Sequence, residues 1–243
     1  MSMRADQDNG LPHYQNVRQQ LRTDLENGRW NPGEILPTEA ELARHFGLSV
    51  GTIRQAVLAL VREGLLTRRP GRGTFVARFD TQGGFGRFFR FRDGSNSPMV
   101  SSVRHLDTTV IEAGDPVIAG KLRVAPTTPL YRIRRMLLGN GEPISLNISY
   151  TDKKRFPDLE KLVLDDQRLY TVLEKRYGIH ILRAEEDLRA GLPEESEAKI
   201  LGISPTTPVM IVERTAYVNR GAVVEWRRTI GRSDKFLYHI SLP

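Results

Sequence analysis

The sequence predicts an α+β protein. A winged helix-turn-helix domain comes first, and an antiparallel sheet with helices, built from an internal duplication, follows it. Two observations predict this fold class. Residues 36–76 read as two short capped helices followed by an arginine-rich hairpin. The motif Pro-Thr-Thr-Pro occurs at 126–129 and again at 205–208 within similar surroundings. A chain of 243 residues has room for both domains.

Local signals define the helix-turn-helix. Thr38 and Glu41 form a capping box, in which each side chain bonds a free N–H of the first helical turn. Gly47 is typical of a left-handed helix end, Ser49 caps a second helix, and Gly64 ends that helix. A turn this short between two capped helices is typical of a helix-turn-helix, whose second helix enters the major groove of DNA.

Apolar residues at helical spacing support these two helices and one helix upstream of them. After the second helix, β-prone runs at 65–67 and 74–76 flank a turn with proline, glycine and three arginines, which predicts a basic hairpin, the wing. The apolar residues are Leu42 and Phe46, then Ile53, Val57, Leu60 and Val61, and upstream Tyr14, Val17, Leu21 and Leu25.

Positive charge concentrates on this domain. Residues 44–78 contain seven arginines and one acidic residue, Glu63, and the whole chain has a net charge of +7. Phosphate binding needs such a concentration of charge. The alternative is a solvated basic surface on a small helical domain. We expect no membrane partner and a cytoplasmic protein, because no run approaches the roughly 18 apolar residues of a membrane span and the N-terminus lacks a signal-peptide pattern.

Residues 11–78 resemble the DNA-binding domain of GntR-type bacterial transcription regulators. The likeness rests on Leu-Pro-Thr-Glu at 36–39, on Ser-Val-Gly-Thr-Ile-Arg-Gln-Ala at 49–56, and on Glu-Gly-Leu followed by Gly-Arg-Gly-Thr-Phe-Val within 63–76. The resemblance implies that the second helix contacts phosphates and base edges, and that the wing tip enters the minor groove. The DNA-binding residues predicted in this way are Thr38, Ser49, Thr52, Arg54, Arg68, Arg69, Gly71 and Arg72.

Arg54 is the best candidate for reading a guanine, because a guanidinium pairs with O6 and N7 through two hydrogen bonds. Two positions depart from the family pattern. Ala40 and Val50 stand where many members carry an arginine. Two potential DNA contacts are therefore missing, so the operator sequence, or the share of recognition given to the wing, is expected to differ from the family norm.

Residues 79–98 are predicted to be a linker between domains at 11–78 and 99–243, because this stretch is rich in glycine, arginine and aromatic residues. The same composition also suits stacking on nucleic acid, and both interpretations stay open.

The second domain contains a diverged duplication, because residues 101–151 align with residues 180–230 at a constant offset of 79 without a gap. Each copy reads as a strand, a helix and a hairpin that turns near Asn-Gly or Asn-Arg-Gly. A further helix between the copies ends at Gly178. Together they predict about six antiparallel strands with helices on one side. The expected strands are 101–112 and 180–191, the helices open at Asp115 and Pro193, and the hairpins are 129–151 and 208–231.

This arrangement resembles the UTRA effector domain of the HutC branch of GntR regulators, which has a chorismate-lyase-like fold. The likeness rests on Arg135 ahead of Gly-Glu-Pro at 141–143, on the strand 144–150, on the run 168–178 and on Glu225 with its neighbour in the last hairpin. The resemblance implies that a cleft between the two copies binds a small anionic metabolite, which is a phosphosugar in several members.

Arginine is the best side chain for binding such an anion, because its planar fork donates paired, charge-assisted hydrogen bonds. Leu137 replaces a second arginine of the family, so a carboxylate effector is at least as well supported as a phosphosugar. An ordinary surface or strand-pairing role is the alternative for each candidate. The effector-binding residues implied by the resemblance are Arg87, Arg135, Asn147, Arg168, Tyr170 and Glu225.

The sequence therefore predicts a homodimeric transcription regulator, most simply a repressor, that a small anionic effector releases from a palindromic double-stranded operator. No cofactor or metal is expected, because the chain has no cysteine and its five histidines are scattered singly. No catalytic residue set stands out, so an enzyme is not expected. The alternatives are a chorismate-lyase-like enzyme fused to a DNA-binding domain, and an architectural DNA-binding protein without a ligand.

Overall fold

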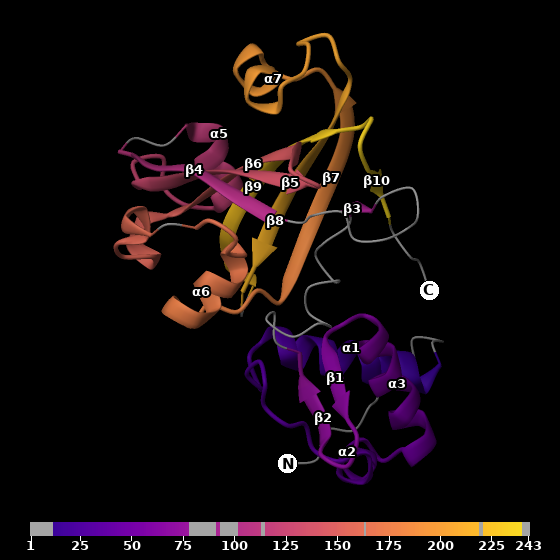
Figure 1. Ribbon diagram of the computed structural model, residues 1–243. Helices are drawn as coiled ribbons and strands as arrows, with labels where there is room; N and C mark the ends of the chain where they lie inside the picture. The colour runs from indigo at the N-terminus through magenta and orange to yellow at the C-terminus, as the bar shows by residue number, and fades with distance from the viewer. Residues whose placement is uncertain are drawn as a thin grey trace. The chain divides into compact units, whose positions relative to one another are not determined.

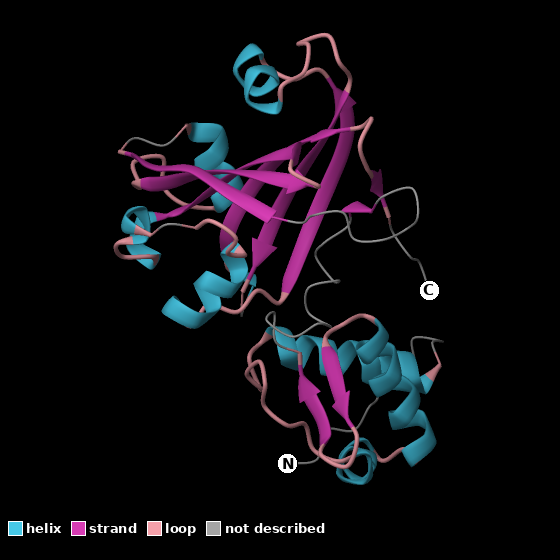
Figure 2. Cartoon of the chain, viewed as in Figure 1, coloured by secondary structure: helices cyan, strands magenta, loops and turns pink. Residues whose placement is uncertain are grey.

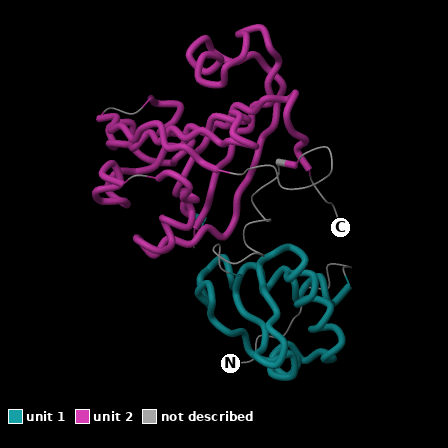
Figure 3. Tube along the Cα trace, in the orientation of Figure 1, with its two compact units in different colours: residues 1–88, 219–221 teal, residues 89–218, 222–243 magenta. Residues whose placement is uncertain are grey.

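The computed structural model describes residues 12–77, 91–92, 102–112, 115–162, 164–218 and 221–239. The chain divides into two compact units (Figures 1 and 3). The first comprises residues 1–88 with 219–221, and the second comprises 89–218 with 222–243. The expected linker lies outside the described residues except for 91–92, and Arg87 lies outside them altogether. The boundaries at 11–78 and 99–243 stay a prediction.

The first unit is the expected winged helix-turn-helix (Figure 2). Thr38 and Glu41 form the capping box, Gly47 is left-handed with φ of 67°, and Ser49 caps the next helix. The two wing strands pair from Leu66 opposite Val76 to Arg69 opposite Gly73. The elements are α1 (His13–Glu26), α2 (Glu39–Phe46), α3 (Val50–Arg62), β1 (Leu66–Arg69) and β2 (Gly73–Val76).

The core of this unit forms from the apolar faces of its helices. Leu21, Ile53 and Leu60 are fully buried where α1 and α3 pack together. The wing is anchored to the segment before α2, because the N–H of Leu36 donates to the carbonyl of Thr74 at 2.8 Å. The wing is therefore held on a packed scaffold while its tip stays exposed.

The second unit is a six-stranded antiparallel sheet with helices. The strand order is β4-β5-β6-β9-β8-β7, so β6 and β9 meet at the centre and β4 and β7 form the edges. The strands are β4 (Ser102–Ile111), β5 (Leu130–Gly139), β6 (Glu142–Asp152), β7 (Arg183–Gly191), β8 (Val209–Tyr217) and β9 (Val223–Arg232). The remaining elements are α5 (Pro116–Leu122), α6 (Leu169–Tyr177), α7 (Glu195–Leu201), short helical turns at Lys153–Arg155 and Leu159–Lys161, and a small pair of strands, β3 (Phe91–Arg92) with β10 (Leu237–Tyr238).

The sheet confirms the internal duplication. The first copy supplies β4, α5, β5 and β6, and the second supplies β7, α7, β8 and β9, in the same order. Adding 79 to the bounds of α5 gives the bounds of α7. Because the strand order is mirrored about the antiparallel pair of β6 and β9, the two copies are related by a pseudo-twofold axis between these strands. Strands β5 and β8 each begin one residue after a proline, as expected for a residue that lacks an N–H donor.

The expectation that all helices cover one side of the sheet is wrong. Alternate side chains of a strand point to opposite faces. On β9, Trp226 packs with α5, and Arg228 forms an ion pair with Glu197 of α7. Tyr170 of α6 instead donates a hydrogen bond to Glu225, which neighbours Trp226 on β9 and therefore points to the other face. Helix α6 comes from the stretch between the copies, so no symmetry places it beside the duplicated helices.

Candidate DNA-binding surface and effector site

The exposed side of α3 carries the predicted DNA-reading arginine. The side chain of Arg54 is 57% exposed, and its Nε lies 2.8 Å from Oε2 of Glu39, the first residue of α2. The other oxygen of Glu39 forms an ion pair with Arg68 of the wing. One carboxylate therefore links the recognition helix to the wing. Sequence reasoning missed this role, because residues 39, 54 and 68 meet only after the three elements pack.

The wing tip depends on glycine at two positions. Gly71 has φ of +69°, a conformation that side chains disfavour. Gly73 has φ of +112°, and a Cβ there would lie 2.9 Å from the side chain of Ile35. The guanidinium of Arg69 lies over the ring of Phe75 at 4.9 Å. The turn is thus fixed by backbone and packing, and it presents arginines on an exposed hairpin.

Two of the predicted contact residues, Thr38 and Ser49, also cap helices with their hydroxyls. The Thr38 hydroxyl donates to Glu41 at 2.8 Å, and Ser49 Oγ accepts from the N–H of Thr52 at 3.1 Å. Ser49 Oγ also lies 2.9 Å from the Thr52 hydroxyl. These side chains orient the helix starts. Their direct contact with DNA stays a prediction, as it does for the arginines.

Four of the predicted effector residues lie together on the face of the sheet that α6 covers. Arg135 on β5 lies directly opposite Asn147 on β6, and the Thr229 hydroxyl on β9 donates to the Asn147 amide oxygen at 2.9 Å. Glu225 accepts a hydrogen bond from Tyr170 of α6. All of them are at least 95% buried. They form a polar cluster in an otherwise apolar interior.

Arg168 differs from these four residues. It occupies the N-cap of α6, two residues before the buried Tyr170, and it is exposed. Partial burial lowers the pKa of Arg168. The structure therefore places Arg168 near the cluster along the chain but at the surface of the unit.

Sequence reasoning missed a second arginine of the polar cluster. Arg227 Nη1 lies 3.9 Å from Glu225 Oε1, and its guanidinium lies 5.6 Å from the centre of the Tyr170 ring. The side chain is 11% exposed. The sequence did contain a signal for Arg227: it lies two residues after Glu225, and residues two apart on a strand share a face.

The protonation of the cluster follows from burial and charge. Burial, and then repulsion from Arg227, lowers the pKa of Arg135 to about 10. Burial alone would raise the pKa of Glu225, but the charge of Arg227 and the hydrogen bonds from Ser149 and Tyr170 lower it overall. Near neutral pH two arginines therefore face one carboxylate, and the cluster carries an excess positive charge.

The same face contains donors without acceptors. Among the described residues, Nε of Arg135, Nε of Arg227 and the Ser145 hydroxyl are buried and have no hydrogen-bond partner. A buried polar atom left in this way costs about 1–3 kcal/mol. An anion that accepts from the arginines would remove the cost and neutralise the charge, so the arrangement suits an anionic ligand.

Within the described ranges, no group of three or more histidine, aspartate or glutamate side chains is placed to bind a metal ion. Over the same residues, no helix combines the length and apolar character that crossing a bilayer requires.

Comparison with known proteins assigns the family. The model of bacterial regulatory proteins of the gntR family matches residues 13–76, and the UTRA domain model matches 97–237. The HTH-type transcriptional repressor NagR of Bacillus subtilis (strain 168) is 30% identical over 237 residues, which cover 97% of both chains. The HTH-type transcriptional repressor PhnF of Mycolicibacterium smegmatis is 29% identical, with 93% of this chain and 90% of PhnF covered.

Solved structures agree with this assignment. The crystal structure of PhnF from Mycobacterium smegmatis superimposes with a TM-score of 0.56 at 25% identity, over 93% of this chain and 99% of that one. The ligand-binding domain of a GntR-family regulator from Bordetella bronchiseptica gives a TM-score of 0.60 at 27% identity, over 65% of this chain and 98% of that one. The relatives are repressors and regulators, not enzymes. The protein belongs to the GntR family of bacterial transcription regulators and carries a UTRA effector domain.

Proposed function

We propose that the protein is a homodimeric repressor that binds a palindromic operator and that a small anionic metabolite, a carboxylate or a phosphosugar, releases from DNA. The observation that carries the ligand class is the buried cluster in which Arg135 and Arg227 face the single carboxylate of Glu225. Buried charges are costly unless they are paired. A cluster with a spare positive charge is therefore best explained by an anion that completes it.

The DNA side of the proposal rests on α3 and the wing. A single recognition helix reads too few bases to select an operator, so two copies related by a twofold axis are expected to read two half-sites. The protein is expected in the cytoplasm, where operator DNA lies. Effector binding in the second unit would change the spacing of the two reading heads, because the effector must favour one arrangement for the two sites to be linked.

The names of relatives give further support for the ligand class. The MngR repressor of Escherichia coli (strain K12), 25% identical over 229 residues, acts on the mannosyl-D-glycerate transport/metabolism system. A glycerate unit carries a carboxylate. A sugar acid is thus a reasonable first class of candidate effector for this chain.

A thermal-shift screen of anionic metabolites, followed by operator binding, tests the proposal. An effector at about 100 times its Kd should stabilise the chain by about 2.7 kcal/mol. The same compound should weaken binding to an operator duplex, measured by fluorescence anisotropy, while its uncharged analogue has no effect. Stabilisation without any change in operator affinity would exclude the release mechanism. An architectural DNA-binding protein would show no stabilisation with any metabolite.

The shared carboxylate of Glu39 gives a separate prediction. Glu39→Gln removes a negative charge that holds Arg54 and Arg68. We expect tighter binding to random DNA, because uncompensated arginines gain phosphate contacts, and a smaller preference for operator, because Arg54 is no longer oriented. Anisotropy titrations of operator and random duplexes at one salt concentration measure both.

Glu63→Gln is the matched control, because it makes the same charge change beyond the opposite end of α3, where Glu63 pairs with Arg18 and Arg22. It should leave the operator preference intact. Equal effects of the two substitutions on the ratio of operator to random affinity would show that Glu39 contributes only net charge.

A further inference from the structure

The two copies of the second unit contain equivalent buried arginines that differ in their partners. Adding 79 to Arg135 gives Arg214, and both are buried on the face that α6 covers. The same offset relates Asp107 on the edge strand β4 to Glu186 on the edge strand β7. A faithful duplication would therefore place a carboxylate opposite each arginine.

The second copy shows that arrangement. Strands β7 and β8 pair in unbroken register from Arg183 opposite Tyr217 to Gly191 opposite Val209. Glu186 therefore lies directly across from Arg214, on the same face of the sheet, and the two side chains form an ion pair. The charge of this buried arginine is compensated from within the protein.

The first copy breaks the arrangement with a bulge. The register of β4 against β5 shifts between His105 and Asp107. His105 lies opposite Arg135, whereas Asp107 lies opposite Arg134. Because neighbouring residues of β5 point to opposite faces, Asp107 points away from Arg135. Asp107 Oδ2 instead accepts from Arg134 Nε at 2.8 Å.

The two residues that precede Asp107 support this assignment of faces. Leu106, the extra residue of the bulge, packs against the apolar cluster on the opposite face that includes Leu146, Leu201 and Ile230. His105 stays on the face of Arg135, where its Nε2 lies 2.9 Å from the Thr108 hydroxyl. Among the described residues, Arg135 forms no ion pair, and its Nη1 donates to the carbonyl of Gln167 at 3.3 Å.

Other charged groups that face Arg135 do not replace the missing carboxylate. Glu225 is the acidic residue that acts on it electrostatically, and it already accepts from Ser149 at 2.6 Å and from Tyr170. Arg227 competes for the same carboxylate at 3.9 Å and repels Arg135. Among the described residues, no carboxylate thus lies opposite Arg135 in the way that Glu186 lies opposite Arg214.

We propose that the bulge in β4 creates the effector site: by turning Asp107 to the opposite face it leaves Arg135 without the directly facing carboxylate that Arg214 has in Glu186, and an external carboxylate or phosphate takes that place. Glu186 holds the equivalent place at Arg214. The domain therefore binds one anion per chain, in its first copy. This inference rests on the proposed function, and it adds the feature that decides which of two duplicated arginines binds the ligand.

A carboxylate placed opposite Arg135 tests the idea. His105→Glu puts an acid at the position in register with Arg135 and imitates the pair of the second copy, while His105→Gln is its uncharged match. The probe is inorganic phosphate, titrated into the full chain by calorimetry in chloride buffer. Arg135→Met identifies the heat that belongs to this site and separates it from phosphate bound elsewhere.

The native chain and His105→Gln should bind one phosphate per chain in the step that depends on Arg135. His105→Glu should weaken that step by about tenfold or more, because the internal carboxylate must be displaced. Equal affinities of His105→Glu and His105→Gln, both folded by circular dichroism, would overturn the role of the bulge and leave the proposed function standing. If the native chain shows no phosphate binding that Arg135→Met removes, both the role of the bulge and the proposed function would be overturned.

Asp107→Asn provides a second test, whose outcome does not depend on the stability of the His105 variants. Asp107 bonds Arg134 on the opposite face, so its neutralisation should change phosphate affinity by less than about twofold. A tenfold gain in affinity in this variant would mean that Asp107 acts on Arg135, and it would contradict the inference.

Discussion

The Arg54→Ala variant is expected to lose specific operator binding while keeping its fold. Arg54 is 57% exposed and lies on the outer side of α3, so its removal leaves no cavity. A guanidinium that pairs with a guanine contributes about 1–3 kcal/mol of discrimination, and a dimer loses that amount at both half-sites. A gel shift or anisotropy titration with the operator measures the loss, and circular dichroism checks the fold.

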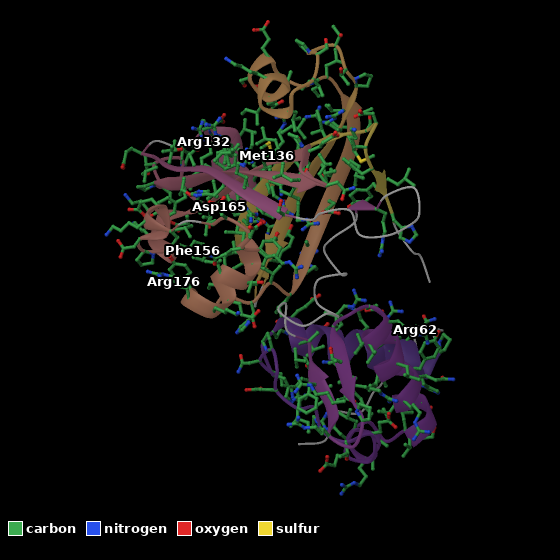
Figure 4. All side chains as sticks on the ribbon, viewed as in Figure 1. Arg62, Arg132, Met136, Phe156, Asp165 and Arg176 are labelled. Carbon is green, nitrogen blue, oxygen red and sulfur yellow. The ribbon has the colours of Figure 1, made fainter. Side chains whose placement is uncertain are left out.

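Arg62→Ala is the matched control. Arg62 is an exposed arginine at the last position of the same helix, so the substitution removes the same charge (Figure 4). It should reduce affinity for operator and random DNA alike and only slightly. Unchanged operator affinity in Arg54→Ala would exclude α3 as the reading helix in the form predicted here.

The Arg135→Met variant is expected to remain on the operator at effector concentrations that release the native protein. Methionine keeps an unbranched chain of similar length, but it removes the guanidinium that the effector needs. The free energy of unfolding without effector should not fall, because a buried charge without an ion-pair partner is costly and methionine removes that cost. Operator titrations with and without the effector, together with thermal melts, measure both effects.

Arg132→Met serves as the control for Arg135→Met. Arg132 lies on the same strand and carries the same charge, but it points to the opposite face of the sheet (Figure 4). This variant should still respond to the effector. A normal response in Arg135→Met would remove Arg135 from the site and with it the main support for an anionic ligand.

Local chemistry made much of the first unit predictable. The capping box at Thr38, the glycine end of α2 and the serine cap of α3 lie where the sequence placed them. These signals act over three or four residues, so they do not depend on the rest of the fold. The role of Glu39 could not be predicted from such local signals, because the two arginines that it binds lie 15 and 29 residues away along the chain.

The second unit also combines features that the local sequence pattern predicted with features that only the tertiary structure decided. The offset of 79 residues correctly predicted that α7 would repeat α5, because both copies inherit the same local pattern. The same offset aligns Arg135 with Arg214 and Asp107 with Glu186. The bulge beside Asp107 overrode that equivalence, since one extra residue in a strand exchanges the faces of the side chains around it.

The sequence by itself determined the winged helix-turn-helix, the duplication and the family resemblance, because capping, periodicity and repetition are written along the chain. Only the tertiary structure decided which face of the sheet α6 covers, that Arg227 joins Arg135 and Glu225, and that Glu39 links two DNA-binding arginines. These features depend on register and on contacts between distant segments. A shift of one residue in register reverses the face of a side chain without any matching change in the pattern of the sequence.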